Sequence, residues 1–407
     1  MITNISFKTM KYIFLLVSGL IFNISFAQTA KDTIPKMLLL DEGLQAELTD
    51  ALDNMYNFQF ATAEKEFLKL RKRYPEHPLP YFIMGLSNWW KMMPNTDIED
   101  FDEPFERHMD SAINKAEKMY KANPKNLEAS FFLAAAHGFK GRLHSDRSQW
   151  LKAASSGRNA LKNLRRGKDV NDLSPEFLFG DGLFNYYSVW IPENYPFLSP
   201  IVATFPKGNK ELGLKQLDEV ARKAFYTRVM ANYFLMFIYN GEGKTHLVLP
   251  IAKKMYENYP ENPYFHRIYA ISTFFMGNHP EAEKLAQDIL TKIEKKQFGY
   301  EAISGRFASY ILGQIYSVKE PDTAKKYFEK VIYFAESIKA YDSGYYHSAL
   351  EWMYLYHKKK NELEKARPYL EKLAKYAEKK NDKRKNAKKD LKTLKKEIKK
   401  QKRIEKM

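Results

Sequence analysis

The sequence contains no cysteine, and it is poor in glycine and proline, with 18 of each among 407 residues. Without cysteine, the chain has no disulfide framework, no thiol nucleophile and no site for a lipid-bearing cysteine behind an export signal. Tyr and Phe, with 27 and 28 residues, outnumber glycine and proline. The scarcity of glycine and proline argues against an all-β fold. It favours helices joined by short turns.

Only the N-terminal segment holds a long apolar run. Lys8 and Lys11 precede apolar residues 12–26, and Ser25 and Ala27 are small residues at the positions that signal peptidase reads. We expect a signal peptide over residues 1–27 and a linker over residues 28–43. The run is shorter than the roughly 20 residues that span a bilayer, and a retained anchor is the alternative. Export predicts a location in the periplasm or cell envelope of a two-membrane bacterium, or secretion.

A frame of residues at offsets of 0, 4 and 12 recurs along the chain, with a small residue first and a proline last. Small residues near one another on a helix allow close contact with the next helix, and the proline cannot continue the helix. The frame occurs at Ala63, Phe67 and Pro75, at Ala112, Ala116 and Pro124, and at Val248, Ala252 and Pro260.

This frame resembles the second-helix signature of the tetratricopeptide-repeat superfamily, from about residue 44 to residue 376. The resemblance implies an all-α fold, a right-handed superhelix (α-solenoid) of about eight helical hairpins over residues 44–378. More locally, Gly182 to Tyr186 and the insert that follows are similar to the inclusion-body-clearance family of tetratricopeptide-repeat proteins. The repeat motif encodes packing, so function must be sought in particular residues.

Two inserts interrupt the 34-residue period of the repeat. The first, at about residues 91–105, is acidic, and the second, residues 186–206, is rich in proline and aromatic residues. Inserts in a solenoid emerge as loops on one face, which is often the face that binds. We expect Trp190, Tyr195 and Phe197 of the second insert to lie in a binding loop or, alternatively, in a plug that folds back onto the superhelix.

The first helix of each tetratricopeptide hairpin lines an inner groove, and the repeat register assigns mostly aromatic residues to it. The assigned residues are Phe82, Trp89, Trp90, Phe177, Phe184, Asn185, Tyr233, Phe237, Asn240, Arg267, Phe274 and Tyr310. Such a groove suits an apolar peptide, a partner helix or a sugar chain; alternatively, the rings pack within the protein. Adjacent Trp89 and Trp90 point about 100° apart on a helix, so we expect at most one of them to lie in the core.

The net charge of +17 is concentrated at the C-terminus. Residues 379–407 hold 15 Lys and Arg against 4 Asp and Glu. Dense like charge with a thin apolar stripe predicts a marginal helix or a disordered basic tail. An anionic membrane surface is a possible partner of this tail, and we expect no nucleic-acid partner because the chain is predicted to be exported.

No motif for catalysis is present, and we expect no catalytic residue, no cofactor and no metal site. The sequence predicts an exported, non-enzymatic scaffold that binds a protein or peptide partner through its aromatic inner groove. The alternative is a carbohydrate-binding or carbohydrate-processing protein of the cell envelope. It would require aromatic rings beside two close carboxylates, one of them Asp181.

Overall fold

The computed structural model describes residues 37–167, 173–377 and 382–404, and these residues form helices and no β-strand. The expected signal peptide, residues 1–27, and residues 28–36 of the linker lie outside the described part. No helix in the described part has the length and apolar character needed to cross a membrane.

The helices follow one another with short connections. Their bounds are η1 (Leu38–Leu40), α2 (Glu42–Tyr56), α3 (Phe60–Arg73), α4 (Pro78–Met92), α5 (Asp102–Ala122), α6 (Leu127–Asp146), α7 (Trp150–Leu164), η2 (Arg165–Gly167), α8 (Pro175–Asn194), η3 (Pro196–Leu198), α9 (Ser199–Val202), α10 (Lys210–Lys223), α11 (Arg228–Gly241), α12 (Thr245–Asn258), α13 (Pro263–Phe275), α14 (His279–Glu294), α15 (Ala302–Tyr316), α16 (Pro321–Ser337), α17 (Gly344–Lys359), α18 (Leu363–Tyr376) and α19 (Asp382–Ile404).

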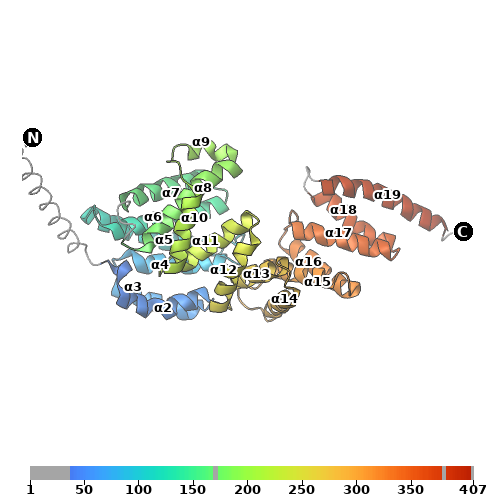
Figure 1. Ribbon diagram of the computed structural model, residues 1–407, viewed down its shortest axis with the longest axis horizontal. Coiled ribbons are helices and arrows are strands. Elements are labelled where there is room, and N and C mark those ends of the chain that lie inside the picture. Colours follow the sequence, from blue (N-terminus) through green and yellow to red (C-terminus); the bar gives the residue numbers. More distant parts are fainter. Residues whose placement is uncertain (1–36, 168–172, 378–381, 405–407) are drawn as a thin grey trace, which may run out of the picture.

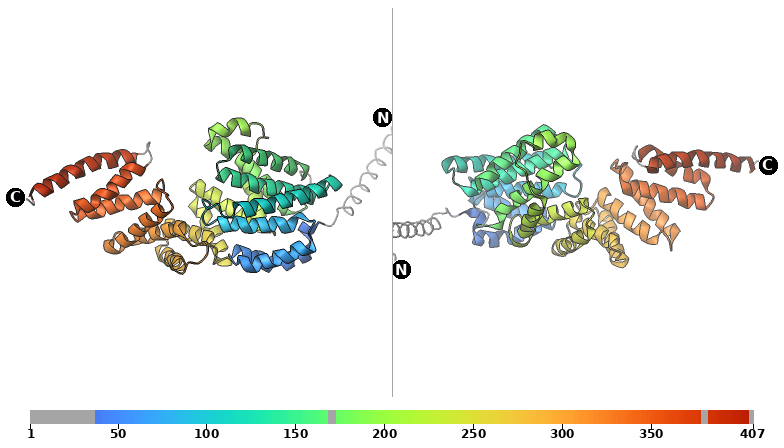
Figure 2. Two further views of the ribbon diagram at one scale, coloured as in Figure 1. Left: turned by 180° about the vertical axis from the view of Figure 1, so that it is seen from behind. Right: turned by 45° about the horizontal axis from the view of Figure 1, so that its top comes forward.

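Consecutive helices pack as hairpins, and the hairpins stack along the molecule (Figures 1 and 2). The first hairpin is α2 with α3 and the eighth is α17 with α18, while η3 and α9 lie between the two helices of the fourth, α8 and α10. The expected all-α solenoid of about eight hairpins is confirmed.

The recurring frame occupies the same structural position in the three hairpins that contain it. Ala63, Ala112 and Val248 are fully buried in the second helices α3, α5 and α12. Pro75 and Pro260 lie two residues beyond the ends of α3 and α12. The small residues therefore allow close helix packing, and the prolines mark the links between hairpins.

Several of the turns within hairpins contain a residue in the left-handed conformation. Gly243 and Gly277 have φ of 71° and 83° in the turns after α11 and α13, where a side chain would be strained. Ser148 adopts the same conformation, with φ of 56°, between α6 and α7. This conformation ends the first helix and directs the chain into the second.

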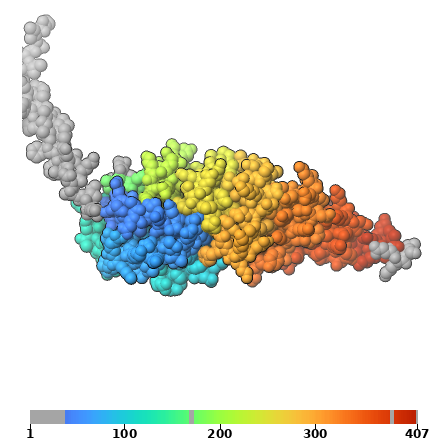
Figure 3. Space-filling model, turned by 90° about the horizontal axis from the view of Figure 1, so that it is seen from below, coloured from blue at the N-terminus to red at the C-terminus, as the bar shows by residue number. Residues whose placement is uncertain are grey.

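The solenoid curves so strongly that its first hairpin touches its fifth and sixth. The Tyr259 hydroxyl donates to the Asp53 carboxylate at 3.0 Å, and the Asn262 amide donates to the Tyr56 carbonyl at 2.8 Å. In Figure 3 the blue N-terminal hairpin lies directly against the yellow part of the chain. The curve is closed by contacts between residues about 200 positions apart in the sequence.

The C-terminal hairpins extend away from this closed part and end in α19 (Figure 1). Residues 382–404 form one helix, whose Ala387, Leu394 and Ile398 are buried in a core shared with α16, α17 and α18. Of the two expectations for this segment, a helix or a disordered tail, the structure has the helix over these residues. The apolar stripe is sufficient because it caps the open end of the last hairpin.

Candidate partner-binding surface

Half of the residues assigned to the inner groove are buried in the core. The buried residues are Phe82, Trp89, Trp90, Phe177, Tyr233 and Arg267. Phe184, Asn185, Phe274 and Tyr310 are partly exposed, and Phe237 and Asn240 are exposed. The first six side chains are enclosed by the protein itself, which agrees with the alternative that these residues pack within the protein.

Trp89 and Trp90 are both core residues because α4 is enclosed from two sides. Trp89 packs on Phe105 and Phe139, with ring centroids 5.7 and 5.4 Å away. Trp90 is 0% exposed, and it faces the other way, toward Tyr56 of α2 and the helices α11 and α13. The inference that two neighbouring tryptophans cannot both be buried is wrong, because it assumed that one side of α4 was open.

The first insert braces this closed part. Arg267 of α13 is buried and donates to the carbonyl of Pro94 at 3.0 Å, and burial lowers its pKa to about 10. Arg147, after α6, donates to both oxygens of the Asp102 carboxylate at 2.6 and 2.7 Å. The acidic insert is thus anchored to its own protein, and Arg267 has a structural role.

The second insert begins as a continuation of α8, which runs to Asn194 with Pro192 inside it. Trp190 is partly buried, and its ring contacts Tyr187, which in turn contacts the buried Phe234 of α11. This chain of rings fixes the base of the insert to the core. Trp190 therefore belongs to an anchor, which matches the plug alternative for this residue.

The outer part of the insert presents an exposed aromatic cluster. Tyr195 and Phe197 are 42% and 63% exposed, and the Phe197 ring contacts Trp150 of α7 at 6.0 Å. Trp150 is 36% exposed and its neighbour Leu151 is 83% exposed. Exposed apolar groups that cluster in this way mark interaction sites more often than isolated ones do.

The other end of α7 is basic. An open cavity of about 360 Å³ lies between α7 and the end of the insert, and its lining residues include Arg158, Lys162 and Arg165 of α7 and η2 together with Phe205. The three cations are exposed. Because a helix turns about 100° per residue, Leu151 lies on the same face of α7 as these cations.

Apolar groups at the start of α7 and cationic groups at its end thus form a strip along one side of the helix. We call it the insert surface, made of Trp150, Leu151, Tyr195 and Phe197 at its apolar end and Arg158, Lys162 and Arg165 at its basic end. From residue 151 to residue 165 the strip is about 21 Å long at 1.5 Å per residue. An extended segment of roughly six residues would cover that length.

Reasoning from the sequence found Tyr195 and Phe197 but missed the residues of α7. A signal for them exists, because Leu151, Arg158, Lys162 and Arg165 are spaced by 7, 4 and 3 residues and so share a helix face. The repeat register directs attention to the inner face, whereas this strip lies beside an insert.

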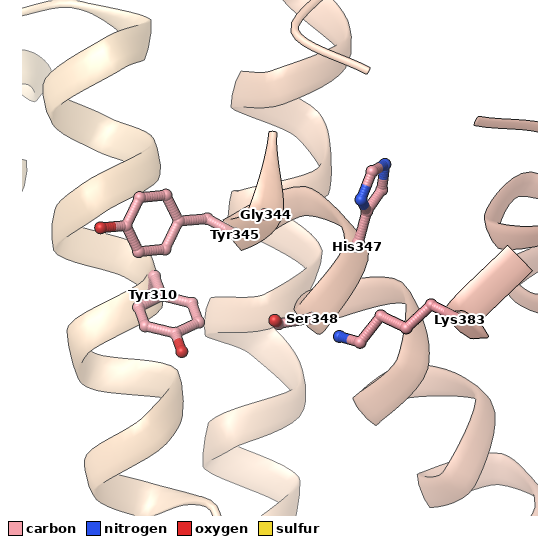
Figure 4. A pocket seen from close by; sticks show the side chains of 6 residues that line it. All are labelled: Tyr310, Gly344, Tyr345, His347, Ser348 and Lys383. Atoms are coloured by element: carbon pink, nitrogen blue, oxygen red, sulfur yellow. The ribbon is translucent and has the colours of Figure 1, made fainter. Parts of the chain in front are cut away.

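A second open cavity, of about 280 Å³, includes one of the expected groove residues, Tyr310 (Figure 4). Tyr310 and Tyr345 form one wall, with ring centroids 4.7 Å apart, and His347 and Lys383 lie on the other side. His347 Nε2 contacts the Tyr341 carbonyl at 2.7 Å, and Lys383 pairs with Glu351 at 2.8 Å. These polar groups already have partners within the chain, so this cavity is the weaker candidate.

Two comparisons with known proteins bear on identity: no protein-family model matches the chain, and no curated protein sequence matches it. In the described part, no group of three or more His, Cys, Asp or Glu side chains is placed to hold a metal ion. Function must therefore be sought in the geometry of the solenoid and its inserts.

Proposed function

We propose that this protein is an exported, non-enzymatic scaffold of tetratricopeptide-repeat type that binds a protein or peptide partner at the insert surface. The repeat frame and its prolines support the repeat type, and the signal expected over residues 1–27 supports export to the periplasm, the cell envelope or the exterior. The observation that carries the binding proposal is the strip along α7, which has exposed aromatic groups at one end and three cations at the other.

The strip defines the chemistry of its ligand. Exposed Phe197 and Leu151 favour an aromatic or aliphatic anchor, since buried aromatic contacts dominate the affinity of interfaces. Arg158, Lys162 and Arg165 favour carboxylates about 10–20 Å from that anchor, a distance set by the rise of a helix. The expected ligand is an extended segment with an apolar residue at one end and acidic residues at the other.

The carbohydrate alternative has less support. It expects rings beside two close carboxylates. Among the described residues that line the cavity at Phe205 and the cavity at Tyr310, none is Asp or Glu.

Selection from a random displayed peptide library tests the proposal on the full chain. Peptides with an apolar anchor and an acidic stretch should be enriched. The change Trp150→Ser with Phe197→Ser should weaken their binding at least about 30-fold, as loss of a hot-spot aromatic residue does. The change Arg158→Gln with Lys162→Gln and Arg165→Gln should remove the acidic preference and keep the apolar anchor.

The matched control carries Val318→Ser and Leu355→Ser, which alter two exposed apolar residues, one in the turn after α15 and the other on α17. It should bind like the wild type. Failure to enrich any peptide family, or equal binding by the control and the Trp150 and Phe197 variant, would contradict the proposal.

A further inference from the structure

Helix α19 has two faces of different chemistry. Ala387, Leu394 and Ile398 are buried against the last hairpin, and Lys395 on the edge of this face pairs with Glu371 of α18 at 3.4 Å. This face accounts for the attachment of α19 to the solenoid. It uses only a few of the helix's cations.

The opposite face is a line of cations. Its exposed residues are Lys385, Lys389, Lys392, Lys396, Lys400 and Arg403. Steps of three and four residues place all six roughly opposite Ala387 and Leu394, and the line is about 27 Å long at 1.5 Å per residue. The acidic residues Asp390 and Glu397 fall on the flank at this helical period, away from the line, and Asp382, the first residue of α19, lies on the same face before the first lysine of the line.

We infer that this cationic line is a docking surface for the anionic headgroups of a lipid bilayer. A straight row of charges can contact a plane of phosphates along its whole length. The row contains no apolar or aromatic residue, whereas the core of a protein interface is depleted of charge and enriched in aromatic residues. The surface is thus suited to adsorption on headgroups, without insertion into the hydrocarbon core.

The position of α19 permits this contact. It is the last helix and lies at the outer end of the molecule, with the solenoid on its other side (Figures 1 and 2). The insert surface on α7 belongs to the opposite part of the chain, so both surfaces can be occupied together. The inference does not depend on the proposed function, and each can fail alone.

Co-sedimentation of the full chain with vesicles tests the inference. One vesicle is phosphatidylcholine alone and the other contains about 30% phosphatidylglycerol. Each cation near an anionic membrane strengthens binding roughly fivefold. Four substitutions, Lys385→Gln, Lys389→Gln, Lys392→Gln and Lys396→Gln, should therefore weaken binding to the anionic vesicles at least about 100-fold.

The matched control loses the same charge elsewhere, through Lys65→Gln, Lys72→Gln, Lys254→Gln and Lys284→Gln at exposed positions. It should keep binding within about threefold of the wild type, if binding is local to α19. Every altered side chain is exposed, so both variants should fold. Circular dichroism spectra that match the helical spectrum of the wild type would show this.

Two competitors identify the source of the phosphate. Inorganic phosphate at the lipid's phosphate concentration, with ionic strength held constant, should leave vesicle binding unchanged, because a row of cations gains its strength from many phosphates at once. Duplex DNA also presents many phosphates at once, so it is the stricter competitor: under the inference the vesicles stay bound at equal phosphate concentration, and displacement by DNA would assign the line to nucleic acid. The inference is overturned if the wild type does not bind anionic vesicles, if it binds neutral vesicles equally, if both variants behave alike, or if inorganic phosphate or DNA displaces the vesicles.

Discussion

Replacing Trp90 with alanine should destabilise the protein by about 3–5 kcal/mol, because this is the usual cost of removing a large aromatic side chain from a core. The Trp90 side chain is fully buried. Its ring contacts Tyr56, Tyr233 and Phe265 at centroid distances of 5.5, 6.1 and 5.3 Å. Since an aromatic pair adds about 0.5–1.5 kcal/mol, the upper half of the range is expected.

Replacing Trp90 with phenylalanine should cost far less. The indole Nε1 of Trp90 is buried and has no hydrogen-bond partner. An unpaired buried donor costs about 1–3 kcal/mol, and phenylalanine removes this donor while it keeps much of the ring. The two effects oppose each other, so we expect Trp90→Phe to lie within about 1 kcal/mol of the wild type.

Urea unfolding and hydrogen exchange measured by mass spectrometry test these values. The three ring partners belong to α2, α11 and α13. Trp90→Ala should therefore reduce protection of peptides from α2 and α13 together, although these helices are far apart in the sequence. Phe275→Ala, at an exposed position that ends α13, is the control and should change stability by less than about 0.5 kcal/mol.

The reasoning is refuted if Trp90→Ala changes stability by less than about 1 kcal/mol, or if protection is lost in α4 alone. Either result would mean that the inner surface of the first hairpins is open. The aromatic groove expected from the repeat register would then be available to a partner, and the insert surface would no longer be the favoured binding site.

Three further predictions concern residues outside the candidate surface. Glu176→Ala should lower the free energy of unfolding in urea by about 3 kcal/mol or more. The reason is that the Glu176 carboxylate accepts hydrogen bonds from three backbone N–H groups and from the Thr227 hydroxyl just before α11. The control Glu211→Ala, at an exposed position, should lower it by less than about 0.5 kcal/mol. Burial lowers the pKa of His266 from 6.5 to about 3, so between these pH values the folded protein binds fewer protons than the unfolded chain. Protonation of this residue in the unfolded chain should therefore lower the free energy of unfolding by roughly 2–3 kcal/mol from pH 7 to pH 4.5. A His266→Gln variant that shows the same fall would contradict this. Ser148→Gly should raise the midpoint of thermal unfolding and stabilise the protein by about 0.5–1 kcal/mol. Ser148 has a φ of 56°, a left-handed conformation that glycine adopts with less strain than serine. A loss of stability would show that the serine side chain compensates for the strain.

The repeat could be predicted from the sequence because its signal is local. Ala63 and Phe67 need only be four residues apart to share a helix face, and Pro75 needs only to follow them to end the helix. The structure buries both residues completely and ends α3 two residues before the proline. Local spacing and local structure agree, and no distant part of the chain is needed to explain them.

The inner groove could not be predicted in the same way because its state depends on distant residues. Trp90 occupies a groove-facing position, yet Tyr233 and Phe265, more than 140 residues later, cover it. Whether such a ring is exposed depends on the curvature of the solenoid. Hydrogen bonds such as that from Asn262 to the Tyr56 carbonyl help to fix this curvature, and no periodic pattern records them.

The insert surface is an intermediate case. Tyr195 and Phe197 could be singled out because they interrupt the period, whereas Trp150 became relevant only when the fold placed it against Phe197. Within this one segment Trp190 anchors the insert, whereas Tyr195 and Phe197 stay exposed. Composition alone could not separate these roles within one segment.

The charge of α19 supports the lipid-docking inference because capping the solenoid does not require it. A cap needs an apolar stripe, here Ala387, Leu394 and Ile398, and any polar outer face. Mixed charges on that face would stabilise the helix, whereas like charges four residues apart, such as Lys392 and Lys396, oppose it by about 0.2–0.5 kcal/mol per pair. A face of one sign therefore costs stability in the free protein. An anionic surface would remove that repulsion on contact, so the stability lost in solution becomes binding energy at the membrane.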